Sequence, residues 1–327
     1  KLYMVKDLLN ELDQFISQVY IPDVCAIGAM YADWLPHGHG VTNYLSVPDM
    51  PLDEAGTEFD FPGGTIMNGD LSTFKEIENF QDPYFNENVT ENIERAWYDG
   101  EWTRHPYEED TTPKFSDFDP DGRYSWIKAP RFGGEVMEVG PLAQVLVGLA
   151  AGHEMTEKWA TTALDKVSSL AGTQVPLSAL HGTIGRHAAR AIRAGIMNEL
   201  SHRHWDLLVN NIASGDVEIF NEPVFTGRQT GCGFHEAPRG ALSHFVVIDN
   251  GKITNYQAVV PSTWNAGPRD GQDRPGPYEA ALVGNPIADP EQPLEVLRTV
   301  HSFDPCIACA VHTLDIDGTE VSKVQAL

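Results

Sequence analysis

The sequence predicts a mainly α-helical protein with small β elements, an α+β arrangement. Two long segments, residues 5–34 and 184–213, repeat apolar side chains at helical spacing. One segment, residues 243–262, contains two short apolar runs joined by Asp249-Asn250-Gly251, which is a strong hairpin signal. The chain has no internal repeat, low-complexity tract or convincing linker, so we expect residues 1–327 to form a single domain.

The first third of the chain begins with one long predicted helix. Residues 5–34 carry its apolar positions, and Pro22 is expected to kink it. Residues 36–90 are rich in Gly, Pro and Asp and lack periodicity, which predicts ordered coil. A short helix is expected near 88–98, followed by a proline-containing loop that reaches Arg131.

The rest of the chain predicts further helices around the hairpin. Pro141 suits the first turn of a helix over 141–151, and a second helix should span 155–170. Residues 184–213 form the longest pattern and predict a core helix. Two short helices near 277–284 and 293–300 lead to a cysteine pair.

The charge balance argues against two classes of partner. Acidic residues number 47 and basic residues 22, which gives a formal net charge of −25. Such a surface repels phosphate backbones and anionic headgroups, so nucleic-acid binding and direct membrane insertion are not expected. The helical pattern already runs at Lys1, which leads us to expect that the chain begins within a longer protein.

The most informative motif is Cys306-Ile-Ala-Cys309 followed by His312. Thiolate and imidazole are soft and borderline ligands that suit nickel, iron or zinc better than magnesium or calcium. Spacing alone leaves open a redox dithiol, a disulfide or half of a structural zinc site. A non-catalytic zinc- or nickel-binding module that uses these three residues is the alternative function.

The longer string around these cysteines resembles a family signature. Asp304-Pro-Cys306-x-x-Cys309-x-x-His312 is similar to the C-terminal motif of NiFe hydrogenase large (catalytic) subunits. Four more blocks resemble that family in the same order: Tyr124-Ser-Trp126-Ile-Lys-Ala-Pro130-Arg131, Glu138-Val-Gly140-Pro141-Leu-Ala143, Ala237-Pro238-Arg239-Gly240-Ala-Leu-Ser243-His244 and Val259-Val-Pro261-Ser262-Thr-Trp264-Asn-Ala-Gly267-Pro268-Arg269. The resemblance covers nearly the whole chain and is nearest to the periplasm-facing uptake type.

The resemblance implies a helical hydrogenase core and a nickel–iron centre with cyanide and carbon monoxide on the iron. In that family Cys306 would be a terminal thiolate on nickel, and Cys309 would bridge nickel and iron. Thiolates suit this role because they are soft and anionic, so they stabilise nickel through redox change. His312 and the backbone carbonyl of Ala258 would bind magnesium (or iron) just beyond the centre.

Arg239 would project its guanidinium over the open coordination position. Its implied role is to orient water or to accept a proton when H₂ splits heterolytically. A guanidinium is a very poor base, so the thiolate of Cys306 is the rival acceptor, and the sequence does not choose between them. Asp304 would pair with Arg239 or position a proton relay.

Other residues in the same blocks are implied to surround the cofactor. Pro261 and Ser262 would lie beside the iron, where a backbone N–H and a hydroxyl donate hydrogen bonds to cyanide. Pro238 and Leu242, which flank Arg239, complete the implied cofactor-binding set.

The chain also departs from the family pattern. It lacks the N-terminal Cys-x-x-Cys and the nearby Glu that complete the metal shell, and Cys25 and Cys232 are expected to be ordinary buried cysteines. We therefore expect two partners, the missing N-terminal half of the large subunit and an iron–sulfur small subunit that carries the electrons.

The tail beyond His312 is the last departure. In the family a C-terminal maturation protease cuts after this histidine, which here would remove residues 313–327. A retained tail would hold both cysteines away from their final positions. The resemblance also implies a periplasmic enzyme that is membrane-associated through partner subunits.

Overall fold

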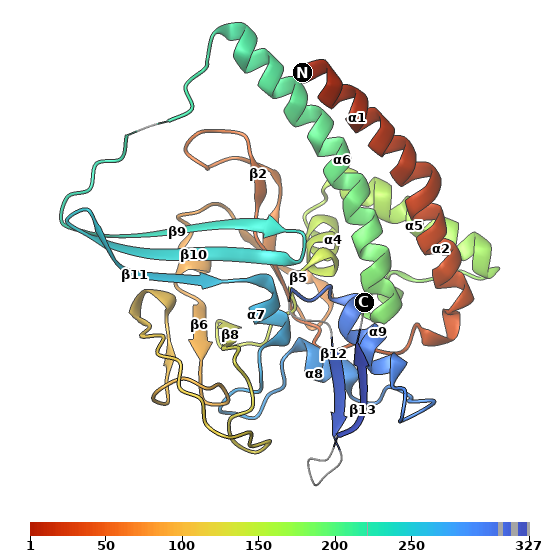
Figure 1. The fold of residues 1–327 in the computed structure, drawn as a ribbon. Coiled ribbons are helices and arrows are strands. Elements are labelled where there is room, and N and C mark those ends of the chain that lie inside the picture. Colours follow the sequence, from red (N-terminus) through yellow and green to blue (C-terminus); the bar gives the residue numbers. More distant parts are fainter. Residues whose placement is uncertain (221, 307–309, 315–319, 326–327) are drawn as a thin grey trace.

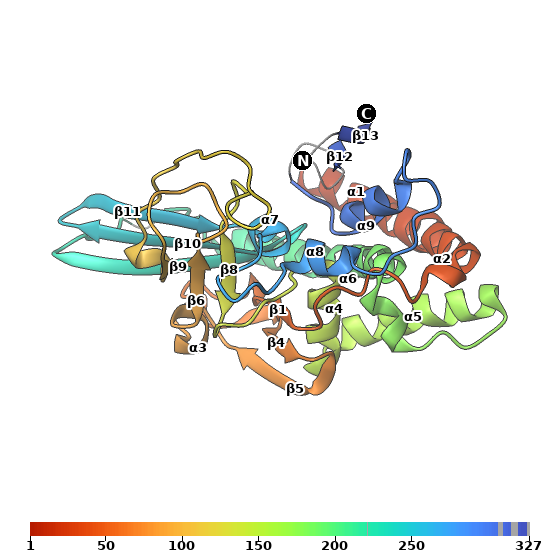
Figure 2. The ribbon, with the colours of Figure 1, turned by 90° about the horizontal axis from the view of Figure 1, so that it is seen from below.

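A computed structural model describes residues 1–220, 222–306, 310–314 and 320–325; for the last two ranges it describes the backbone (Figure 1). Figure 2 shows β9, β10 and β11 at one side of the molecule, α1, α2 and α5 at the other, and α4 and α8 between them. The observed mixture of helices and small sheets confirms the predicted fold class.

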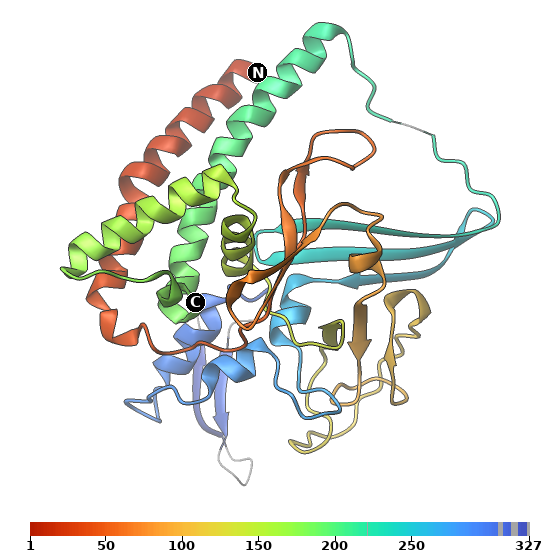
Figure 3. The same ribbon diagram turned by 180° about the vertical axis from the view of Figure 1, so that it is seen from behind.

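The chain begins with the predicted long helix. It comprises α1 (Leu2–Phe15), a π-helical turn (Ile16–Tyr20) and α2 (Ile21–Met30), followed by a 3₁₀ turn (Ala32–Trp34). Pro22 has no N–H to donate and crowds the preceding turn, so the widened π turn accommodates it without a break. Helices α1 and α2 lie along α6, and α5 packs against α2 and α6 (Figure 3).

Three further helices form the main core where the sequence predicts them. They are α4 (Pro141–Ala150), α5 (Glu154–Ala171) and α6 (Thr183–Ser214), with a 3₁₀ turn (Leu177–His181) before α6. Helix α6 ends at Gly215, which adopts the left-handed conformation that commonly closes helices. One face of α6 packs Ile192, Ile196 and Leu200 into this core.

A three-stranded antiparallel sheet builds the second core. Its order is β11 (Lys252–Val259), β10 (Gly240–Asp249), β9 (Arg228–Ala237). The hairpin β10–β11 confirms the prediction. Strand β9 was not predicted, because its two glycines and polar residues lack an alternating apolar pattern and its conformation depends on pairing with β10.

Two predictions between residues 36 and 98 are wrong. The expected coil contains short strands and a helix: β1 (Tyr44–Ser46), β2 (Asp49–Pro51), β3 (Phe59–Phe61), β4 (Gly63–Met67), β5 (Asp70–Ile77) and α3 (Pro83–Asn86). The expected helix at 88–98 is instead β6 (Val89–Asn92), which pairs with β7 (Thr103–Arg104) and β8 (Ala129–Phe132). Pairing with a strand 40 residues away outweighs weak local preference.

The C-terminal region contains the two predicted short helices, α8 (Pro277–Leu282) and α9 (Leu294–Ser302). It also contains α7 (Pro261–Ala266) and the paired strands β12 (Ala310–Leu314) and β13 (Glu320–Gln325). A 3₁₀ turn from an earlier part of the chain (Pro106–Glu108) packs against β11. Among the helices in the described ranges, none has the length and apolarity needed to cross a bilayer.

Candidate metal centre

The candidate site begins at the turn between β9 and β10. Pro238 and Arg239 form this two-residue turn, because Ala237 and Gly240 are paired across it. Gly240 has φ +125°, and a Cβ there would lie 2.4 Å from the backbone nitrogen of Gly140. Only glycine allows this approach, so the turn is held against the start of α4.

Segments that are far apart in the sequence meet around this turn. The Asn265 side chain accepts a hydrogen bond from the Val139 N–H at 3.0 Å and donates one to the Val139 carbonyl at 2.8 Å. Farther along, Arg131 Nε donates to Asp270 Oδ2 at 2.9 Å. These bonds join three of the blocks that resemble hydrogenases, directly or through the adjacent residue Asp270.

Arg239 and Asp304 form the central contact of the site. Arg239 Nε donates to the backbone carbonyl of Asp304 at 2.7 Å, and its Nη2 donates to Asp304 Oδ1 at 3.3 Å. The side chains are 34% and 40% exposed. Asp304 has φ +56°, a left-handed conformation that short polar residues tolerate. The guanidinium is therefore held in place while part of it remains accessible.

Cys306 lies two residues beyond Asp304 and is exposed. Its backbone N–H donates to Ser262 Oγ at 3.2 Å. Ser262 is buried in the first turn of α7, and Pro261 is the first residue of that helix. The structure thus brings Arg239, Asp304, Ser262 and Cys306 to one place from three separate segments.

The remaining predicted site residues are placed less fully. Pro238 is exposed at the turn, Leu242 is half-buried on β10, and Ala258 is exposed on β11. Cys309 lies outside the described residues, and of His312 only the backbone, on β12, is described. Within the part of the chain that the structure describes, no three His, Cys, Asp or Glu side chains cluster closely enough to hold a metal.

Tyr278 of α8 is a residue of this site that sequence analysis missed. Its ring packs on Phe303 with the centroids 4.7 Å apart. Burial raises the pKa of Tyr278, and the nearby carboxylate of Asp304 raises it further. The phenol therefore stays protonated at neutral pH and can act as a hydrogen-bond donor.

Arginines on α6 are the second missed feature. Arg186, Arg190 and Arg193 recur at positions i, i+4 and i+7, so they share one face of α6, in the half of that helix that contains its buried residues. This spacing is visible in the sequence and was the available signal. Burial lowers the pKa of Arg190, and the negative charge of Asp304 opposes that shift.

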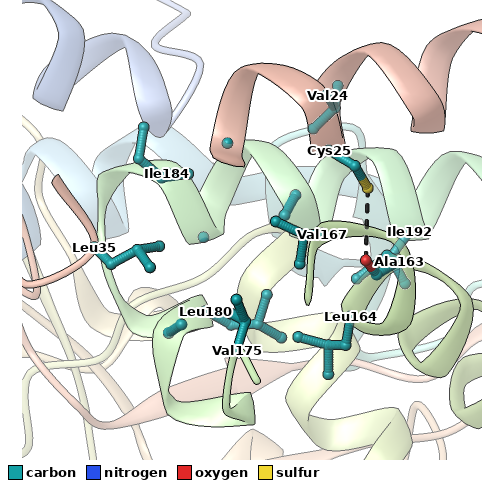
Figure 4. A pocket seen from close by; sticks show the side chains of 14 residues that line it. Val24, Cys25, Leu35, Ala163, Leu164, Val167, Val175, Leu180, Ile184 and Ile192 are labelled. Carbon is teal, nitrogen blue, oxygen red and sulfur yellow. Dashed lines mark hydrogen bonds between the residues drawn. The ribbon is translucent and has the colours of Figure 1, made fainter. Parts of the chain in front are cut away.

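The two isolated cysteines lie elsewhere. Cys25 is buried as predicted, and its thiol donates to the Ala163 carbonyl at 3.5 Å, whereas Cys232 is only partly buried. Burial raises the pKa of both thiols, that of Cys232 to about 12. Cys25 lines a small apolar cavity of about 40 Å³ between α2, α5 and α6 (Figure 4). Neither thiol has the low pKa that favours metal binding.

An exposed thiol, a guanidinium and a buried hydroxyl are typical of a site that binds a soft metal through thiolate. The described residues fit part of a nickel–iron group: Cys306 offers a soft donor, and Arg239 and Tyr278 offer hydrogen-bond donors. The fit is incomplete because one thiol alone does not complete a nickel shell.

Comparison with known proteins specifies the family. Residues 1–312 match the family model for nickel-dependent hydrogenase, and the chain belongs to this family. It is 45% identical over 329 residues to the hydrogenase-2 large chain of Escherichia coli K12. That alignment covers 100% of this chain and 58% of the relative. It is 38% identical to the uptake hydrogenase large subunit of Rhodobacter capsulatus, covering 99% of this chain and 57% of the relative.

Solved structures agree. The Ni-Fe-Se hydrogenase from Desulfovibrio vulgaris Hildenborough matches with a TM-score of 0.75 and 29% identity, over 93% of this chain and 60% of that one. The Ni-Fe-Se hydrogenase from Desulfomicrobium baculatum matches with a TM-score of 0.74 and 27% identity, over 93% and 59%. The chain thus spans less than two thirds of the length of these relatives and corresponds to the C-terminal part of the large subunits.

Proposed function

We propose that this chain is the C-terminal part of the catalytic large subunit of a NiFe hydrogenase that interconverts H₂ with protons and electrons. One observation carries the proposal: Arg239 is hydrogen-bonded to Asp304, two residues before Cys306, whose own backbone is bound to Ser262. These are the groups that must lie together if a guanidinium is to face a thiolate-bound metal.

The proposed chemistry divides between the metal group and the chain. When bound, the nickel–iron centre supplies the Lewis acidity and redox capacity that H₂ cleavage needs. The thiolate of Cys306 can take up the released proton, and the exposed N–H groups of Arg239 orient water beside it. Asp304 keeps the guanidinium in place, and the phenol of Tyr278 remains a donor near both.

We assign the remaining ligands by the same proposal. Cys306 and Cys309 would hold the metals, and His312 with the carbonyl of Ala258 would hold magnesium (or iron). Pro238, Leu242, Pro261 and Ser262 would line the site of the iron, which in this proposal would carry cyanide and carbon monoxide. Buried backbone and hydroxyl donors such as those of Ser262 suit the strong acceptor nitrogen of cyanide.

The proposal extends to maturation. A protease removes residues 313–327, so that 1–312 remains. The His312–Thr313 bond lies within β12, where these residues pair with Lys323 and Ser322 of β13. Cleavage would remove β13 and free the segment that carries both metal-binding cysteines. Mass spectrometry of the chain from nickel-replete and nickel-depleted cells tests this step.

The partners and location follow from the same proposal. Electrons leave through an iron–sulfur small subunit, because the four cysteines of this chain are too few for both a nickel site and relay clusters. An N-terminal part of the large subunit supplies the other thiolates. The enzyme would be periplasmic and would reach the membrane only through partner subunits.

Metal analysis with infrared spectroscopy tests the central proposal. The large subunit, expressed with its small subunit, should contain nickel and iron and show cyanide and carbonyl stretching bands. Cys306→Ala should abolish nickel binding, whereas Cys232→Ala, which alters a partly buried cysteine on β9, should leave it unchanged. Zinc as the only metal, without such bands, would instead establish the non-catalytic metal-binding module.

A second experiment isolates the guanidinium. Arg239→Lys should lower H₂ oxidation by about 10²-fold or more, the usual effect of removing one preorganised donor, with nickel content unchanged. Arg203→Lys is the matched control, because Arg203 also pairs with an aspartate, Asp60, but lies farther along α6. Equal activity of the two variants would contradict the proposed role of Arg239.

A further inference from the structure

The first turns of α6 contact the segment that leads to Cys306. Thr183 Oγ1 lies 3.3 Å from Thr299 Oγ1, and the guanidinium of Arg186 lies 3.8 Å from the ring centroid of Phe303. Arg190 Nη2 donates to the Ser302 carbonyl at 3.1 Å. Figure 1 shows α9, which ends at Ser302, beside this end of α6. Three successive turns of one helix therefore hold residues 299–303.

Arg190 differs from its neighbour Arg186 in how its charge is met. Arg186 donates two hydrogen bonds to the buried carboxylate of Glu138, at 2.7 and 2.9 Å. Across the described ranges, no carboxylate lies within 4.0 Å of the guanidinium of Arg190, and its buried Nε has no hydrogen-bond partner. A buried cationic N–H without an acceptor is costly, so Arg190 is suited to face a negatively charged group.

The charges around Asp304 indicate what kind of group suits the surroundings of Arg190. The Asp304 carboxylate is bound by Arg239, and its charge acts on Arg190 as well. One carboxylate, paired only with Arg239, thus faces the positive charges of both Arg239 and Arg190 close to Cys306, which leaves an excess of positive charge. Such an excess suits an anionic group like a thiolate- and cyanide-ligated metal centre.

We propose that Arg190 is a positioning residue: it docks the Cys306-bearing segment onto α6 through the Ser302 carbonyl and supplies positive charge toward the metal group. This inference rests on the proposed function for its charge component only. The docking component concerns residues 299–306 in the chain itself.

Hydrogen–deuterium exchange on the whole chain tests docking without any metal. Arg190→Met should raise amide exchange in the peptide that contains residues 299–306 by at least about fivefold, because it removes the hydrogen bond from a charged donor to the Ser302 carbonyl. Arg190→Lys should restore most of the protection, since an ammonium can donate to the same carbonyl. Arg203→Met, on the same helix, should leave this peptide unchanged. Unaltered exchange in Arg190→Met overturns the docking role.

Infrared spectroscopy of the assembled enzyme tests the charge. The cyanide bands of Arg190→Met should shift relative to the unsubstituted enzyme, and those of Arg190→Lys should return toward it, because lysine retains the charge. A purely structural role would not make the bands depend on charge in this way. Unshifted bands in Arg190→Met overturn the charge role, whereas absence of all bands in the unsubstituted enzyme contradicts the proposed function and leaves the exchange result standing.

Discussion

Two arginine–carboxylate pairs in this protein differ in how deeply they are buried and in how many hydrogen bonds they share. Arg186 and Glu138 are 3% and 1% exposed and share two hydrogen bonds, while Arg186 also donates to the Gly38 carbonyl at 2.6 Å. Arg239 and Asp304 are 34% and 40% exposed, and their carboxylate contact is a single bond of 3.3 Å. Protein atoms cover the first pair almost completely, whereas the second pair stays partly accessible to solvent.

This difference in burial distinguishes an ion pair that stabilises the fold from one that can take part in a reaction. Burying both charges of the first pair is tolerable only because their donors and acceptors are largely satisfied, so this pair joins α6 to the segment before α4. The second pair keeps contact with solvent, so its guanidinium can exchange partners at little cost. Predictions that separate the two pairs follow, from the largest expected effect on stability to the smallest.

Glu138→Gln should lower the free energy of unfolding by about 3–5 kcal/mol, because it leaves the buried charge of Arg186 without its counter-ion. Urea denaturation followed by circular dichroism measures the change. Asp304→Asn is the matched control, because it makes the same substitution in the open pair. If both variants lose the same stability, burial does not distinguish the two contacts.

Glu236 should make the free energy of unfolding decrease as pH rises, because its pKa is higher in the folded chain. Burial raises its pKa to about 8 from an ordinary value near 4.5, so the folded chain holds a proton that the unfolded chain has released between these values. The free energy of unfolding should therefore fall as pH rises from about 4.5 to 8, by up to about 1.4 kcal/mol per pH unit from this group.

Glu236→Gln removes the ionisable group and should flatten this part of the profile. Denaturation midpoints measured at several pH values report the slope. Burial and the neighbouring Glu91 also raise the pKa of Glu109, to about 8, so the difference between the two proteins, and not the absolute slope, reports Glu236. Superimposable profiles would show that Glu236 is ionised in the folded chain.

Asp304→Asn should cost less than about 1 kcal/mol, because exposed ion pairs contribute little. Asparagine also adopts the left-handed backbone conformation at this position. Its effect should instead appear at the site, as lower H₂ oxidation with normal nickel content. Thermal denaturation and metal analysis of the same sample distinguish the two effects, and a large loss of stability would place Asp304 with the structural pairs.

Lys114→Ala should change the free energy of unfolding by no more than about 0.5 kcal/mol. Lys114 pairs with Asp99 at 2.7 Å, but the side chains are 66% and 57% exposed, so water replaces the contact readily. Measured together with the other variants, Lys114→Ala shows the smallest loss of stability expected when an ion pair is removed from this protein. A loss above 1 kcal/mol would mean that exposure is a poor guide to these pairs.

Elements with strong local signals were predictable from the sequence. The helices over 141–151, 155–170 and 184–213 and the hairpin at Asp249-Asn250-Gly251 follow from periodicity and turn chemistry within one segment. Strands β6 and β9 were missed because their partners, β8 and β10, create the environment that makes them strands. Their own residues carry little alternation.

The sequence by itself determined which chemistry is available: the Cys306-x-x-Cys309 spacing and the block around Arg239 are written in consecutive residues. Only the tertiary structure decided that Arg239 reaches Asp304 across 65 positions, and that Arg190 and Tyr278 lie beside them. The physical reason is that motif chemistry depends on neighbours along the chain, whereas burial, charge and hydrogen bonding at a site depend on neighbours in space.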